Sequence, residues 1–281
     1  MSKTAFVFSG QGAQFPGMGK DLYENSPAAK KIFDTLENLR PGTISQCFNG
    51  TQEELNQTVN TQPCMFAVSL AAAESFKEQG FVASAIAGFS VGELAALTFA
   101  GAINIQDGFN LVCKRAEIMN AAALKTKGSM AAVLRLESKK TEELCKSAGV
   151  YPVNYNCPQQ VVVAGEAEKM AAFISEVSQN GGRALPLAVS GAFHSPLMSE
   201  ASAQFADVLK TVKFYAPKIP VYANITARPY GDGIAAILSK QMDSPVLWQT
   251  TVENMLADGI TEFNETGPGI VLTGLIAKIR G

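Results

Sequence analysis

The fold is decided by the stretch Ser84-Ala85-Ile86-Ala87-Gly88-Phe89-Ser90-Val91-Gly92-Glu93-Leu94-Ala95-Ala96-Leu97. Its first four residues predict a short strand, and its last five are good helix formers. The five residues between them match the pattern G-x-S-x-G, in the strand–turn–helix context that this pattern requires. Glycines on either side let the backbone turn sharply, so we expect an exposed Ser90 hydroxyl at a helix N-terminus, where developing negative charge is favoured. The alternative is a plain tight turn.

Strands alternate with helices on the N-terminal side of this motif. Thr4 to Phe8 is a short apolar run that leads into a glycine-rich loop, and it predicts a buried strand. Pro27 to Leu39 predicts an amphipathic helix, and Gln62 to Gln79 a more buried one. Alternating strands and helices favour a parallel sheet covered by helices, and with G-x-S-x-G they predict an α/β fold whose large domain is α/β-hydrolase-like.

The pattern changes between Gly128 and Ser190, where the order becomes β-α-β-β-α-β. This order is typical of a ferredoxin-like unit, here inserted as a small domain over residues 128–189. The large domain then comprises residues 1–127 and 190–281. Within the insert we predict strands at Met130–Leu134, Tyr151–Tyr155, Val161–Ala164 and Ala184–Val189, and helices at Thr141–Ala148 and Ala167–Asn180. Beyond it we predict a helix at Glu200–Val212, a strand at Val221–Asn224 and a helix at Gly269–Ile279.

Composition narrows the class of protein. Of the 281 residues, 47% are hydrophobic and 17% charged, which supports a sizeable core and excludes disorder. The net charge of −2 gives no general reason to bind nucleic acid or anionic lipid, and no apolar run reaches the length of a membrane span. The 5 cysteines lack a C-x-x-C spacing and the N-terminus lacks a secretory signal, so we expect reduced thiols and a cytoplasmic protein.

A serine nucleophile needs a base, and His194 is the only histidine. It lies in the small-residue loop Ser190-Gly191-Ala192-Phe193-His194-Ser195-Pro196, where the chain returns to the large domain and could face Ser90. A histidine with purely structural hydrogen bonds is the alternative. No carboxylate stands out as a third member, Asp107 being the only aspartate between the two residues, so a Ser–His dyad is expected. A backbone carbonyl or a carboxamide could orient the imidazole.

The sequence lacks the common motifs for binding nucleotides and for histidine-rich metal sites. The loop Gly10-Gln11-Gly12-Ala13-Gln14-Phe15 lacks the third glycine of a dinucleotide fingerprint, and no G-x-x-x-x-G-K-[ST] exists. One histidine and no H-E-x-x-H exclude a histidine-rich metal site, whereas a carboxylate-only magnesium site has no signature in a sequence. We therefore expect no metal and no cofactor.

Six motifs together resemble one family, the malonyl-CoA:acyl carrier protein transacylases, over essentially the whole chain. They are Gly10-Gln11-Gly12-Ala13-Gln14, Thr61-Gln62-Pro63, Gly88-Phe89-Ser90-Val91-Gly92-Glu93, Lys114-Arg115-Ala116, Ala192-Phe193-His194-Ser195 and Glu265-Thr266-Gly267-Pro268-Gly269.

The resemblance implies a role for each matching position. Ser90 would take the malonyl group from coenzyme A as an ester, and His194 would act as general base and acid. The backbone N–H groups of Gln11 and Val91 would form the oxyanion hole. Arg115 would pair with the malonyl carboxylate through its planar fork, where the alternative is a solvated helix arginine.

Further positions follow from the same resemblance. A main-chain carbonyl, placed at Gln241, would orient the histidine. Gln62 would line the substrate cleft or cap a buried helix start, and Phe193 would contact substrate or fill the core. The family usually has histidine before the nucleophile, whereas this chain has Phe89, so a polar contact near the acyl group is missing.

The implied activity is ping-pong transfer of malonyl from malonyl-CoA to the phosphopantetheine thiol of acyl carrier protein for fatty-acid synthesis. A trans-acting acyltransferase of a polyketide synthase, an acyl-thioester hydrolase and a non-catalytic binding module are the alternatives. We expect a monomer that binds neither nucleic acid nor membrane. Lys125, Lys127 and Arg183 could contact the acidic carrier protein, although exposed basic residues usually have no such role.

Overall fold

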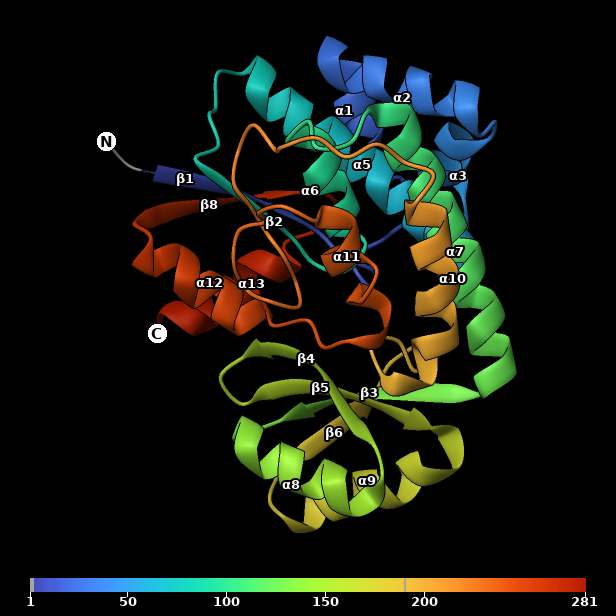
Figure 1. Cartoon of the computed structure of the whole chain (residues 1–281), viewed down its shortest axis with the longest axis vertical. Helices are drawn as coiled ribbons and strands as arrows, with labels where there is room; N and C mark the ends of the chain where they lie inside the picture. The colour runs from blue at the N-terminus through green and yellow to red at the C-terminus, as the bar shows by residue number, and fades with distance from the viewer. Residues whose placement is uncertain (1–2, 190) are drawn as a thin grey trace.

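The computed structural model describes residues 3–189 and 191–281 (Figure 1). Within these residues the strands form a parallel sheet, in the order β7-β2-β1-β8, and a separate antiparallel sheet, in the order β4-β5-β3-β6. The strands are β1 (Lys3–Phe8), β2 (Ala85–Gly88), β3 (Gly128–Leu134), β4 (Tyr151–Cys157), β5 (Gln160–Glu166), β6 (Arg183–Pro186), β7 (Val221–Tyr222) and β8 (Ile260–Thr266).

Helices connect these strands and cover both sheets (Figure 1). The α-helices are α1 (Lys20–Asn25), α2 (Pro27–Leu39), α3 (Thr43–Asn49), α4 (Gln52–Leu55), α5 (Thr58–Glu78), α6 (Gly92–Phe99), α7 (Ile105–Thr126), α8 (Ser138–Ala148), α9 (Ala167–Gln179), α10 (Ser199–Leu209), α11 (Ile234–Leu238), α12 (Trp248–Ala257) and α13 (Val271–Arg280). Two 3₁₀ turns are also described, η1 (Pro196–Met198) and η2 (Gln241–Asp243).

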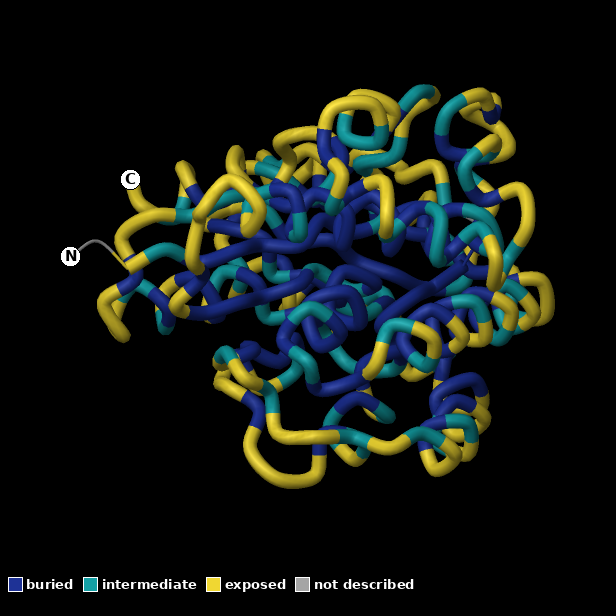
Figure 2. Tube along the Cα trace, turned by 90° about the horizontal axis from the view of Figure 1, so that it is seen from above, coloured by how far each residue is buried: buried dark blue, intermediate teal, exposed yellow. Residues whose placement is uncertain are grey.

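The parallel sheet is buried on both faces because successive side chains of β1 enter two different cores. Phe6 and Phe8 belong to the larger hydrophobic cluster, which also holds the apolar side chains of α5, α6 and α7. Ala5 and Val7 belong to a second cluster, on the side of α12 and α13. The tube in Figure 2 shows this buried centre under a more exposed outer layer. Ser90 follows β2 and therefore lies at the carboxyl edge of the parallel sheet.

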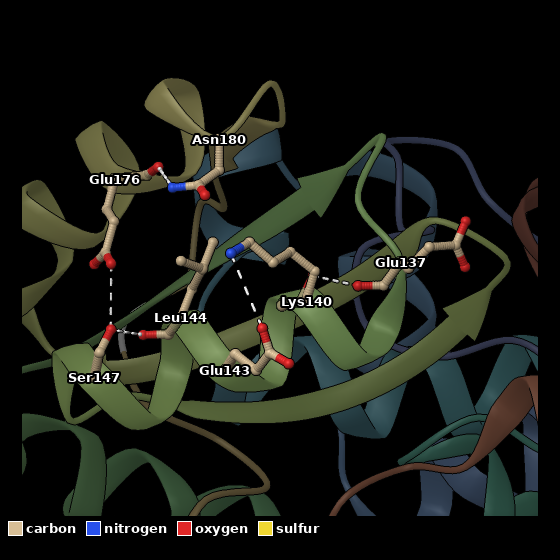
Figure 3. Close-up of polar contacts among 8 residues, drawn as sticks. Glu137, Lys140, Glu143, Leu144, Ser147, Glu176 and Asn180 are labelled. Carbon is tan, nitrogen blue, oxygen red and sulfur yellow. Dashed lines mark hydrogen bonds and ion pairs between the residues drawn. The ribbon is translucent and has the colours of Figure 1, made fainter.

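The antiparallel sheet has its own core. Between β3 and β6 the elements follow the predicted order, β3-α8-β4-β5-α9-β6. Apolar side chains of α8 and α9 pack on one face of the sheet. On the outer side the Ser147 hydroxyl of α8 donates to the Glu176 carboxylate of α9 over 3.2 Å, which links the two helices (Figure 3). The sheet's other face is turned toward the parallel sheet (Figure 1).

The predicted and observed elements differ mainly where the sequence pattern is weak. Helix α2 has the predicted bounds, whereas α5 begins four residues earlier, at Thr58. Strand β8 has no predicted counterpart because its sequence, Ile260-Thr-Glu-Phe-Asn-Glu-Thr266, is largely polar. The predicted end of the insert falls beside residue 190, which lies outside the described residues. Among the described residues, no helix has the length and apolar character needed to span a membrane.

Candidate active site

Ser90 lies in the turn between β2 and α6 with a left-handed backbone, at φ +52°. The two flanking glycines, which were predicted to let the backbone turn sharply, provide the space for this turn. A Cβ on Gly88 would lie 2.1 Å from the backbone carbon of Gly92, and a Cβ on Gly92 would lie 2.3 Å from the carbonyl oxygen of Phe8. The glycines therefore let α6 start against β1 and β2, while the serine itself carries the unfavourable dihedral.

Asn224, just after β7, stabilises this turn through two side-chain hydrogen bonds. Its Oδ1 accepts the backbone N–H of Ser90 at 2.8 Å, and its Nδ2 donates to the carbonyl of Gly88 at 2.6 Å. A single side chain thus bonds the residues before and at the turn. The sequence analysis did not find Asn224, because an asparagine at the end of a short strand has no distinctive spacing.

His194 faces Ser90 as predicted. Its Nε2 lies 2.7 Å from Ser90 Oγ, and its Nδ1 lies 2.8 Å from the main-chain oxygen of Gln241. Since a carbonyl can only accept, Nδ1 carries the proton, and the neutral ring leaves Nε2 free to accept from the serine hydroxyl. Burial, and then the positive charge of Arg115, lower the pKa of His194 to about 4. The imidazole is therefore neutral at physiological pH and able to take a proton.

Arg115, on α7, is 1% exposed, and its guanidinium points toward the Ser90 hydroxyl. Its Nη2 donates to Ser90 Oγ at 3.2 Å and to Gln241 Oε1 at 2.7 Å, while its Nη1 donates to Gln62 Oε1 at 2.7 Å. Its Nε is buried and has no hydrogen-bond partner among the described residues. Burial lowers the pKa of Arg115 to about 10, with Glu93 acting in the opposite direction. The solvated-helix alternative is wrong, since this cation is buried beside the serine.

Glu93, in the first turn of α6, is a buried carboxylate that the sequence analysis did not single out. Its Oε1 accepts from Asn224 N at 2.9 Å and from the Tyr230 hydroxyl at 2.8 Å, and its Oε2 accepts from Gln241 Nε2. Burial raises the pKa of Glu93 to about 7, and the three hydrogen bonds and Arg115 oppose that rise. A usable signal existed, because Glu93 interrupts an otherwise apolar helix three residues after the serine.

The remaining predicted residues lie around this centre. Val91 is the N-cap of α6, and Gln11 follows β1 in the glycine-rich loop. Phe89 is half-buried and stacks edge-on against Trp248, with ring centroids 5.6 Å apart. Phe193 is buried in the larger hydrophobic cluster and is outside the polar network. Gln62 is also buried, and besides Arg115 it contacts Met119.

A cleft of about 390 Å³ opens between the parallel and antiparallel sheets. Gln11 and Phe89, the residue before Ser90, line this cleft, as do Asn154 and Asn156 of β4. Both asparagines are more than nine-tenths buried, and neither Oδ1 has a hydrogen-bond partner among the described residues. Two of the residues that line the cleft therefore carry buried acceptors without a partner among the described residues.

The arrangement joins a serine on a strained turn, a neutral imidazole and a buried cation within hydrogen-bond distance of one another. Such a site can form and break an ester at Ser90 Oγ while holding a negative group at Arg115. In residues 3–189 and 191–281, no group of three or more His, Cys, Asp or Glu side chains is placed to hold a metal ion.

Known proteins are similar to this chain in sequence over most of its length. Residues 5–277 match the acyl transferase domain family. A malonyl CoA-acyl carrier protein transacylase of Bacillus subtilis is 40% identical, with 100% of this chain and 91% of the relative covered. The polyketide biosynthesis protein ThaF of Burkholderia thailandensis is 39% identical over 99% of this chain but only 24% of its own length.

A solved structure agrees with these relatives. A malonyl-transacylase in complex with its type II PKS acyl-carrier protein superposes with a TM-score of 0.95 at 36% identity, and 99% of this chain and 93% of that one are covered. Family, sequence and fold thus agree over nearly the full length. The chain belongs to the acyl transferase family and, within it, to the malonyl CoA-acyl carrier protein transacylases.

Proposed function

We propose that this acyltransferase moves a malonyl group from malonyl-CoA to the phosphopantetheine thiol of an acyl carrier protein, through an ester on Ser90. One observation carries the proposal, the position of Arg115 Nη2 at 3.2 Å from the hydroxyl that His194 contacts at 2.7 Å. A buried cation beside a serine nucleophile suits an acyl group that ends in a carboxylate.

The reaction has two matching halves. Ser90 Oγ attacks the thioester carbonyl while His194 Nε2 takes the hydroxyl proton, and the carbon–sulfur bond then breaks. The histidine returns that proton to the departing coenzyme A sulfur. In the second half His194 takes the proton of the carrier thiol, the sulfur attacks the ester, and the proton goes back to Ser90 Oγ. The N–H groups of Gln11 and Val91 hold the oxyanion in both halves.

Arg115 selects the malonyl group by its charge. Its two terminal nitrogens donate to amide oxygens of Gln62 and Gln241, and its unpartnered Nε–H can donate to a further acceptor. A carboxylate entering here forms a charge-assisted pair in a site from which water is largely excluded. Phe89 and Phe193 supply the apolar surroundings of the acyl group, and Gln62 keeps the guanidinium in place.

The cleft between the sheets accommodates the pantetheine arm. This arm carries amide N–H groups, and Asn154 and Asn156, which line the cleft, each have a buried Oδ1 without a hydrogen-bond partner among the described residues, so a small movement of either side chain would turn an acceptor toward the arm. Coenzyme A and the carrier protein bear the same arm, so one cleft serves both halves of the reaction.

Intact-protein mass spectrometry tests the proposal. After brief mixing with equimolar malonyl-CoA and acetyl-CoA, the parent should carry a malonyl adduct, and Ser90→Ala should carry none. The adduct should persist for minutes without an acceptor and disappear when carrier protein bearing the phosphopantetheine thiol is added. Absence of the adduct from the parent, with no coenzyme A released, would leave a non-catalytic binding module.

A hydrolase is separated by the same experiment, because it would release malonate and return free Ser90 without any acceptor. The similarity to a polyketide biosynthesis protein, and to a transacylase seen with a type II PKS acyl-carrier protein, keeps a polyketide role as the second candidate. Comparing transfer to a fatty-acid carrier protein with transfer to a polyketide carrier protein decides between the two pathways.

Several further expectations complete the proposal. We describe the larger part, residues 1–127 and 190–281, as α/β-hydrolase-like and the part from 128 to 189 as a ferredoxin-like insert. Malonyl-CoA is a substrate, and no cofactor or metal takes part. The five cysteines, unpaired in the described chain, suit a cytoplasmic location. The protein acts as a monomer without nucleic acid or membrane, and Lys125, Lys127 and Arg183 remain candidates for contact with the carrier protein.

A further inference from the structure

Gln241 makes more contacts in the active site than are needed to orient His194 through its main-chain carbonyl. Its Nε2 donates to Ser90 O at 2.8 Å and also to Glu93 Oε2. Its Oε1 accepts from Arg115 at 2.7 Å, and its main-chain oxygen holds His194 Nδ1 at 2.8 Å. One residue therefore contacts the backbone of the nucleophile, the base and the cation at once.

The orientation of this amide is set by its partners. An Nε2 group has two hydrogens, and here each of them has one acceptor, a backbone carbonyl and the Glu93 carboxylate. The Oε1 atom faces a guanidinium, which only donates. If the amide turned over, its donor would face Arg115 and its acceptor would face the carboxylate. Glu93 and Arg115 thus fix the amide in one orientation.

We propose that Glu93 is a positioning residue for the reaction, which acts through Gln241 to align Ser90, His194 and Arg115 together. The proposal rests on the transferase function given above. Glu93 touches none of the reacting atoms in the described structure, and its contacts are with Gln241, Asn224 and Tyr230. It takes the place of a triad acid but acts through Gln241, because the carboxylate accepts from the side-chain amide of that residue and the histidine bonds its main-chain carbonyl.

Burial alone does not account for a carboxylate at this position. Glu93 is 1% exposed, and placing an anion in such surroundings is costly unless it is fully hydrogen-bonded. A glutamine of the same shape could satisfy Asn224 N and the Tyr230 hydroxyl through its oxygen. It could not accept from Gln241, because its Nε2 would meet the Nε2 of that residue. The contact that demands a carboxylate is the one that leads to the reacting groups.

Glu93→Gln tests the inference directly. It removes the acceptor for Gln241 while keeping the size and shape of the side chain. We expect kcat/KM to fall for both malonyl-CoA and acetyl-CoA, because His194 is misaligned for either. The fall should be about tenfold greater for malonyl-CoA, because only this substrate also uses Arg115. A role confined to stability would lower both values by the same factor, leaving their ratio unchanged.

Two further variants sharpen the test. Tyr230→Phe removes a donor from the Glu93 oxygen that faces away from Gln241, so it should lower stability and leave the malonyl-to-acetyl ratio at the parental value. Gln241→Met keeps the main-chain carbonyl for His194 and removes the amide, so it should lower the ratio as Glu93→Gln does. This second variant decides the matter if Glu93→Gln fails to fold.

The outcomes separate the inference from the function on which it rests. A parent that forms no malonyl adduct overturns the proposed function. A parent that forms the adduct, with a parental ratio in folded Glu93→Gln or in Gln241→Met, overturns the positioning role alone. Unfolding of each variant in urea, followed by circular dichroism, shows which proteins are folded when the ratios are measured.

Discussion

Two polar networks in this molecule use nearly the same kinds of groups in opposite surroundings. Around Ser90 a carboxylate, a cation and amides lie buried between helices and a sheet, and almost every polar atom has a partner. On α8 and α9 a similar set lies at the surface, where Lys140 and Glu143 are 45% and 59% exposed and 3.9 Å apart (Figure 3). Water can replace any partner in the second network but not in the first. Burial therefore fixes the relative positions of the groups in the first network.

Among changes to the two networks, Arg115→Ala in the buried one is expected to have the largest effect, on kcat/KM for malonyl-CoA. Removing one member of a buried, hydrogen-bonded charge pair costs about 2–5 kcal/mol, so kcat/KM for malonyl-CoA should fall about 30-fold or more. Acetyl-CoA has no carboxylate, and its use should rise relative to malonyl-CoA. Steady-state acylation with each substrate measures both. Arg228→Ala, which removes an exposed arginine, is the matched control. An unchanged malonyl preference in Arg115→Ala would disprove the carboxylate contact.

The second effect concerns the dependence of stability on pH. The pKa of Glu93 is raised from 4.5 to about 7 in the folded protein, so its stabilising contribution is complete below pH 4.5 and is lost as the pH rises through 7. Glu93→Gln has no such loss. Its free energy of unfolding, relative to the parent, should therefore improve by about 3 kcal/mol between pH 4.5 and pH 8.

Urea unfolding of the parent and of Glu93→Gln at several pH values measures this difference. The surface network supplies the control, since Glu143 is well exposed and water can replace its partner, so Glu143→Gln should change the free energy of unfolding little. A parallel response of the two variants would mean that burial does not distinguish the networks.

The smallest effect is expected from Lys140→Ala, which removes the cation of the exposed pair on α8. An exposed i,i+3 ion pair contributes about 0.5 kcal/mol or less, and alanine is itself a good helix former. The free energy of unfolding should therefore change by less than about 0.5 kcal/mol, and the acylation rate should stay at the parental value. A loss as large as that expected for a buried contact would mean that exposure does not weaken the contribution of this ion pair.

Sequence patterns predicted those parts of the fold that depend on local regularity. The apolar periodicity of Pro27 to Leu39 gave the bounds of α2, and the β-α-β-β-α-β order predicted the antiparallel sheet together with its helices. Strand β8 was missed because it is largely polar and belongs to the sheet only through its pairing with β1. Such a pairing joins residues more than 250 positions apart, and no local pattern reports it.

The active site shows the same division. Ser90 and His194 could be placed because a motif and a unique residue mark them, and the structure brings them within 2.7 Å. Asn224 and Tyr230 could not, because each is an ordinary residue until the fold turns its side chain toward the serine turn or toward Glu93. Glu93 was overlooked, although it interrupts an otherwise apolar helix. The left-handed dihedral of Ser90 itself was not predicted, because the motif indicates only that glycines flank a sharp turn, and these glycines provide the space for it.

The central place of β1 in its sheet has a consequence for synthesis of the protein on the ribosome. Residues of β1 pair with residues 85–88 on one side and with residues 260–266 on the other. The parallel sheet can close only after nearly the whole chain has emerged, whereas residues 128–186 contain every strand of the antiparallel sheet. Distant pairings form slowly and leave apolar edges open in the meantime. We therefore expect the part that holds Ser90 to mature last, and acyl-transfer activity to appear only once β8 has been added.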